Sequence, residues 1–100
     1  MTSHMRVKIS ESAHHDLECG FRFYESQEIG VGQYFIDTMY SELESLCLFA
    51  GIHNKKFGFY RMLTRKFPYS VYYRISEDVV QIWRILDNRR NPKWIEDQLT

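Results

Sequence analysis

The sequence predicts one small α+β domain in which a helical hairpin packs on an antiparallel β-sheet. Its 100 residues, 44% of them hydrophobic, can bury a single core but leave no room for a second domain. Apolar residues recur at helical spacing in the first half of the chain, and three runs rich in aromatic and β-branched residues follow in the second half. We assign the domain to residues 5–100. Residues 1–4 match no periodic pattern, so we expect a disordered leader or a remnant of cloning.

The first half of the chain predicts a short strand followed by two helices. Residues 6–10 alternate, with Val7 and Ile9 on one face, as in a half-buried strand. Ser10 can cap the next helix, and Gly51 can close the second one. Between the helices, glycines at positions 30 and 32 interrupt the pattern. The two apolar stripes are Ala13, Leu17, Phe21 and Tyr24, and then Phe35, Met39, Leu43, Leu46 and Ala50.

The second half predicts a three-stranded meander over residues 57–64, 67–75 and 79–86, because only short polar links separate these runs. The middle strand has an apolar side, which we expect the helices to cover, and a mixed side. The apolar side carries Tyr69, Val71, Tyr73 and Ile75. Pro92 suits the first turn of a short C-terminal helix, because a proline there loses no hydrogen bond.

Composition narrows the function classes. The 13 Lys and Arg balance the 13 Asp and Glu, so no overall positive field attracts nucleic acid, and any such contact needs a local patch. Cys19 and Cys47 lack metal-site or disulfide spacing, and we expect buried, reduced thiols. The adjacent His14 and His15 diverge by about 100° on a helix, so we expect exposed polar positions, no metal and no cofactor. Neither a membrane-spanning stretch nor a signal peptide occurs, which predicts a cytoplasmic protein without membrane contact.

Three stretches of sequence carry a family resemblance. They are Gly58-Phe59-Tyr60-Arg61, the run from Phe67-Pro68-Tyr69 to Tyr73-Arg74, and Leu86-Asp87-Asn88-Arg89-Arg90-Asn91-Pro92. Together with the order of the elements, they resemble the RelE/ParE superfamily of type II toxin–antitoxin systems, and within it the ParE branch of plasmid stabilization proteins. The likeness spans roughly Met5 to Trp94. It implies a growth-inhibiting toxin that a cognate antitoxin protein neutralises.

The resemblance leaves the cellular target open. RelE-like members cut messenger RNA in the ribosome, and on that alternative the matching catalytic residues would be Arg61, Arg65 and Arg89. However, Ser70 replaces that branch's strand arginine and Ile95 replaces its C-terminal tyrosine. Each lost charge stabiliser commonly costs about two to three powers of ten in rate. The sequence therefore favours a ParE-like, non-enzymatic inhibitor of DNA gyrase over a ribonuclease that acts on the ribosome and mRNA; a non-toxic binding module on the same scaffold is the third alternative.

The densest positive site is the pair Arg89 and Arg90 after the last predicted strand. An arginine fork can bind a carboxylate or phosphate through two parallel hydrogen bonds, which suits contact with the target or the antitoxin. We expect three more cations to lie nearby if the last two strands pair: Arg74, Arg84 and Lys93. The structural alternative is an ion pair between Asp87 and one arginine of the pair.

Overall fold

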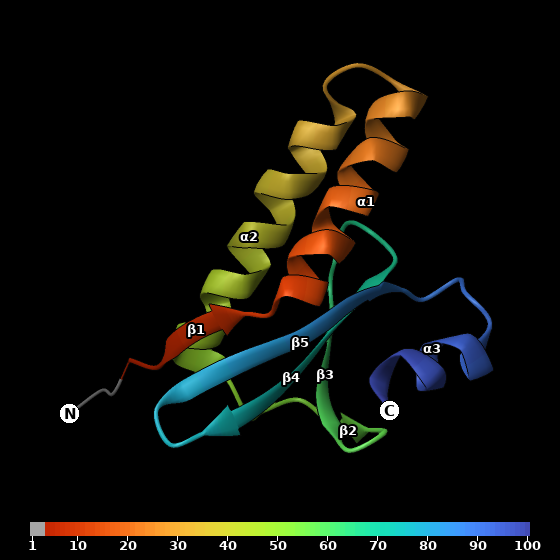
Figure 1. The fold of residues 1–100 in the computed structure, drawn as a ribbon. Coiled ribbons are helices and arrows are strands. Elements are labelled where there is room, and N and C mark those ends of the chain that lie inside the picture. The colour runs from red at the N-terminus through yellow and green to blue at the C-terminus, as the bar shows by residue number, and fades with distance from the viewer. Residues whose placement is uncertain (1–3) are drawn as a thin grey trace.

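A computed structural model describes residues 4–100 as a five-stranded sheet with a helical hairpin on one face and a short helix near one end (Figure 1). The predicted α+β class and order of elements are confirmed. Of the proposed leader, residues 1–3 lie outside the described part, and His4 is exposed. The elements are β1 (Arg6–Ile9), α1 (Glu11–Gln27), α2 (Val31–Phe49), β2 (Lys55–Lys56), β3 (Phe59–Leu63), β4 (Tyr69–Ser76), β5 (Val79–Asp87) and α3 (Pro92–Leu99).

The sheet has the strand order β1-β5-β4-β3-β2. Strands β3, β4 and β5 form the expected antiparallel meander, whereas β1 pairs with β5 in parallel, so the sheet is mixed rather than purely antiparallel. The prediction also missed β2 and started the next strand too early. Phe57 and Gly58 have φ of 57° and 83°, and these left-handed conformations turn the chain between β2 and β3.

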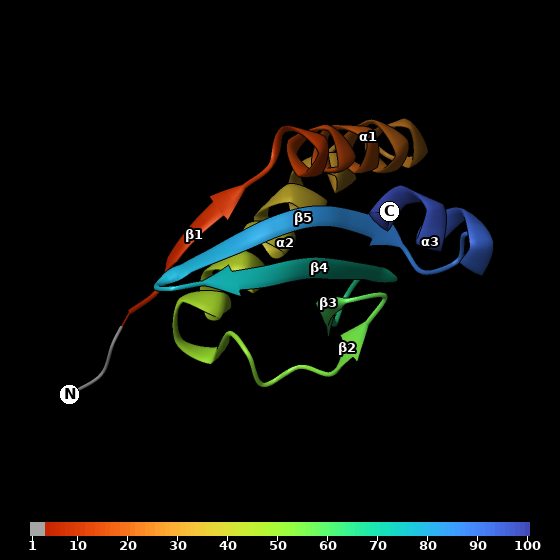
Figure 2. The same cartoon turned by 60° about the horizontal axis from the view of Figure 1, so that its bottom comes forward.

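The two helices begin and end where local chemistry dictates. The Ser10 hydroxyl accepts the Ala13 N–H at 3.0 Å, which confirms the predicted cap of α1. Gly30, with φ of 96°, precedes α2, and Gly51, with φ of 98°, follows its C-terminal cap. Both figures show α1 and α2 as neighbours, and the colours of Figure 1 show that they run antiparallel (Figures 1 and 2). All residues of the two predicted stripes except Phe21 belong to the larger core or pack against it.

Side chains on the two faces of the sheet form two separate cores. The larger core lies between the hairpin and the apolar side of β4, as predicted. The side of β4 predicted to be mixed faces a second core under α3, made of Phe59, Tyr72, Leu86, Ile95 and Leu99. Fully burying one such side chain contributes roughly 1.5–3 kcal/mol, so α3 is held by packing rather than by its own helix propensity.

The side-chain environments correct one prediction and support another. Cys19 is exposed, with its Sγ 3.4 Å from His15 Nε2, and Cys47 is half-buried, so the expectation of two buried thiols is wrong for Cys19 and only partly met by Cys47. His14 and His15 are exposed, as expected. Within residues 4–100, no helix has the length and apolar character needed to cross a membrane. The same residues contain no group of three His, Cys, Asp or Glu side chains placed to hold a metal.

Candidate functional site: the end of β5 and the second face of the sheet

Arg89 is anchored to the end of β5. Its Nε and Nη2 donate to the Asp87 carboxylate at 3.0 and 2.6 Å, and its guanidinium lies 5.9 Å from the Phe23 ring centroid. Burial alone would raise the pKa of Asp87, but hydrogen bonds and charge from Arg89 outweigh it and hold that pKa below its usual value. The ion pair predicted for Asp87 is confirmed, and Arg89 keeps part of its fork free because it has five N–H donors.

Arg90 has no carboxylate partner within ion-pair distance in the described part of the chain. Its guanidinium stacks 3.9 Å from the Trp94 ring centroid, which fixes the side chain without neutralising it. Lys93, on the first turn of α3, is instead paired with Asp97 at 3.0 Å, one helical turn further on. The positive charge of Arg90 is therefore the one most available for a partner at this end of the sheet.

Arg84 is part of a partly buried network rather than a surface contact. Its Nε and Nη2 donate to Asp16 at 2.7 and 2.9 Å, and its Nη1 donates to the Gln98 side chain at 3.0 Å. Asp16 also accepts the Ile85 N–H at 2.9 Å. Only 16% of the Arg84 side chain and 9% of the Asp16 side chain are exposed. Arg84 thus ties α1, β5 and α3 together, although it was predicted as a contact for the target or antitoxin.

Arg74 lies far along the sheet from Arg89. It pairs in register with Gln81, whereas Arg89 follows Asp87 at the other end of β5. Six residues of strand correspond to about 20 Å, so the expectation that Arg74 joins the Arg89 site is wrong. The Arg74 guanidinium stacks 4.1 Å from the Phe59 ring centroid and 5.6 Å from that of Trp83.

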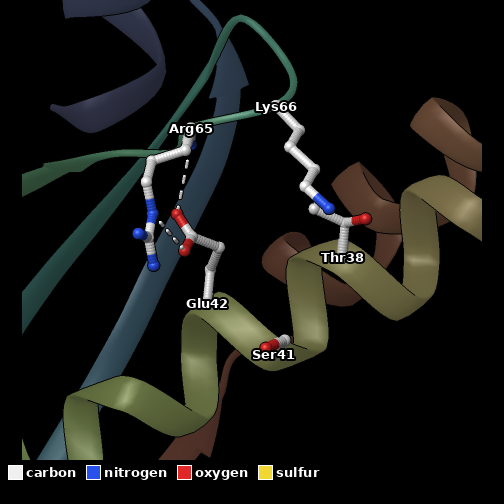
Figure 3. Close-up of a pocket in the computed structure, with 5 residues that line it drawn as sticks. All are labelled: Thr38, Ser41, Glu42, Arg65 and Lys66. Atoms are coloured by element: carbon white, nitrogen blue, oxygen red, sulfur yellow. Dashed lines mark hydrogen bonds and ion pairs between the residues drawn. The ribbon is translucent and has the colours of Figure 1, made fainter.

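The three residues of the ribonuclease alternative contact three different parts of the molecule. Arg65 approaches Glu42 of α2, with Nε 3.7 Å from the carboxylate, beside a hollow of about 310 Å³ that Lys66 and Thr38 also line (Figure 3). Arg61 pairs in register with Tyr72 and lines a pocket on the face of the sheet that α3 covers, which we call the second face. Arg89 faces α1 through Phe23. The residues that these three arginines contact do not overlap.

One basic pocket was missed by the sequence reasoning. It has a volume of about 110 Å³ and lies between the sheet and the start of α3. Its polar lining consists of Lys56, Arg61, Tyr72, Asn88 and Arg90. These residues come from four separate segments, and no local pattern signals that the fold brings them together.

Comparisons with known proteins identify the family. The model of the ParE toxin of type II toxin–antitoxin systems, parDE, matches residues 7–92. A solved structure described as the chromosomal ParDE TA system from P. aeruginosa contains a similar fold, with a TM-score of 0.74 and 20% sequence identity, over 82% of this chain and 94% of that one. No match to a curated protein was found.

Proposed function

The chain belongs to the ParE toxin family of type II toxin–antitoxin systems, and from this premise we propose that it stops growth by binding DNA gyrase without cutting nucleic acid. We further propose that it acts in the cytoplasm and that a cognate antitoxin neutralises it by direct binding.

The dispersal of Arg61, Arg65 and Arg89 is the observation that carries the non-enzymatic proposal. Metal-free RNA cleavage needs a base, a charge stabiliser and an acid that converge on one phosphate. These three side chains contact the second face, α2 and α1 instead.

Two other positions of the ribonuclease alternative are committed to packing. Ser70 is fully buried and donates to the Asn88 side-chain oxygen at 2.5 Å. Ile95 is buried in the second core, under α3. Neither position can offer a charged or acidic group to a substrate.

For the contact with gyrase we propose Arg90 together with the free donors of Arg89. Arg90 is exposed and has no carboxylate partner within 4 Å in residues 4–100. Its stacking on Trp94 limits the side-chain entropy lost when a partner binds. Arg74 and Lys93 remain secondary candidates, because both are exposed.

For the antitoxin we propose the open edge of β3 and the apolar side chains beside it. Only the first two residues of β3 pair with β2, so Met62 and Leu63 have no strand on their outer side. Ile52 and Leu63 line one hollow of about 330 Å³ and are 72% and 56% exposed. An extended segment could add a strand here and bury these side chains.

Purified gyrase tests the proposal. With relaxed plasmid and ATP, a small molar excess of the chain should block supercoiling, and Arg90→Ala should weaken the inhibition. The matched control is Arg22→Ala, which removes an exposed arginine on α1 and should leave inhibition unchanged. Full supercoiling at large excess of folded protein would exclude gyrase as the target. Codon-specific mRNA cleavage in a translation extract would instead support the ribonuclease alternative.

A further inference from the structure

The positive charges that lack a partner are unevenly distributed over this neutral protein. Within residues 4–100, six of the 13 Lys and Arg are paired with carboxylates. Three of the remaining seven, Lys56, Arg61 and Arg90, line the one pocket between β2, β3 and the start of α3. No Asp or Glu lines that pocket. Three uncompensated cations around one small volume favour a bound anion.

The neutral groups of the pocket also present donors. The Asn88 side-chain oxygen accepts from Ser70 at 2.5 Å, which orients its NH₂ group away from that bond. Tyr72 is 1% exposed, and its hydroxyl makes no hydrogen bond within residues 4–100. Every side-chain polar atom that is fully buried in these residues has a hydrogen-bond partner, so the Tyr72 hydroxyl is not fully buried. Solvent therefore reaches the Tyr72 hydroxyl at the pocket. Guanidinium, ammonium, amide and hydroxyl groups together match the oxygens of an oxyanion.

The size and aromatic lining favour a carboxylate over a nucleotide. A volume of about 110 Å³ holds a carboxylate group, whereas sites for larger ligands measure roughly 300–1,000 Å³. Base binding needs an open aromatic face, but of the two aromatic side chains that line the pocket, Phe57 has the Lys56 ammonium over its ring, 5.4 Å from the centroid, and the ring of Tyr72 is buried. The zero net charge also gives no long-range attraction for RNA.

We propose that Lys56, Arg61 and Arg90, with Asn88 and Tyr72, form an oxyanion pocket that binds an Asp or Glu side chain from an acidic segment of a partner protein. The proposal does not depend on gyrase being the target, because any protein with such a segment could supply the carboxylate. It gives the second face of the sheet a recognition role separate from the apolar β3 edge.

A labelled hexaglutamate peptide tests the pocket, with fluorescence anisotropy at about 150 mM salt as the readout. The chain should bind the peptide saturably, and Arg61→Gln and Lys56→Gln should each weaken binding by about tenfold, which corresponds to about 1.4 kcal/mol. Lys66→Gln is the matched control: it removes the same charge from the α2 side, where Lys66 is also unpaired (Figure 3). It should change binding by less than about twofold, as expected for a charge outside the site.

Three results would overturn the proposal. Absence of saturable binding would exclude the pocket. Equal losses in Lys66→Gln and Lys56→Gln would show attraction by net charge alone. Tighter binding of a labelled hexauridylate, lost in the same two variants, would assign the pocket to RNA phosphate. Lys56 is exposed, so its variant keeps the test valid if Arg61→Gln fails to fold.

Discussion

Removing the carboxylate of Asp16 should destabilise the fold more than any change to a surface ion pair. In Asp16→Ala, the Arg84 guanidinium loses both carboxylate bonds while only 16% of its side chain is exposed, and the Ile85 N–H loses its acceptor. Breaking a buried pair by removing one partner costs about 3–5 kcal/mol, because it leaves an uncompensated charge. For a domain of this size, 3 kcal/mol lowers Tm by at least about 12 °C.

Urea unfolding followed by far-UV circular dichroism measures this loss. The matched control is Glu18→Ala, which breaks the exposed Arg22 pair on the same helix and should cost less than about 0.5 kcal/mol. In the double variant Asp16→Ala/Arg84→Met the buried charge is gone as well, and at least half of the loss should be recovered. An Asp16→Ala variant within about 1 kcal/mol of the parent would refute the reasoning that this network holds α1, β5 and α3 together.

Two further perturbations test the interior. A methyl group added in Gly20→Ala would lie 2.5 Å from the ring of the fully buried Phe35. We therefore expect the free energy of unfolding, measured in urea, to fall by about 1–3 kcal/mol despite the better helix propensity of alanine. Phe35→Leu should cost less stability in the Gly20→Ala background than in the parent protein, because the smaller side chain relieves the clash. The Tyr73 hydroxyl accepts the Gly51 N–H at 2.9 Å and is hydrogen-bonded to His53 Nδ1 at 2.5 Å, and burial lowers the pKa of His53. Because the pKa of His53 is lower in the folded state, the unfolded chain binds a proton at this residue more readily. The stability that neutral His53 contributes is therefore complete above about pH 6.5 and is lost as the pH falls through the lower folded pKa. The urea midpoints at pH 7.5 and 5.5 should therefore differ less in His53→Gln than in the parent protein. An unchanged difference would contradict the assignment of this pH dependence to His53.

The helices could be predicted almost completely because apolar spacing directly records which side of a helix is buried. Leu17, Phe35 and Met39 lie in the core that their spacing indicated, and Ser10 caps α1 as expected. The start of β3 could not be placed, because the left-handed conformation of Phe57 is imposed by the turn from β2 and has no signal in an aromatic-rich run. The parallel pairing of β1 with β5 could not be placed either, because the two helices and strands β2, β3 and β4 separate the partners along the chain.

The candidate site was predicted only where its partners are close in sequence. The Asp87–Arg89 pair spans two residues and could be anticipated. Asp16 and Arg84 lie 68 residues apart, so nothing near Arg84 indicated that its charge is satisfied internally. The basic pocket around Arg61 could not be predicted for the same reason, because the other residues that line it come from β2, β4 and the segment after β5.

Mapping of mRNA 5′ ends in cells after induction of the chain without an antitoxin tests most directly whether it acts without cutting RNA. Growth should stop while transcripts show no new ends at the ribosomal A site, as expected from the separation of Arg61, Arg65 and Arg89. New ends in phase with the codons, lost in Arg61→Ala together with the growth arrest, would contradict the account.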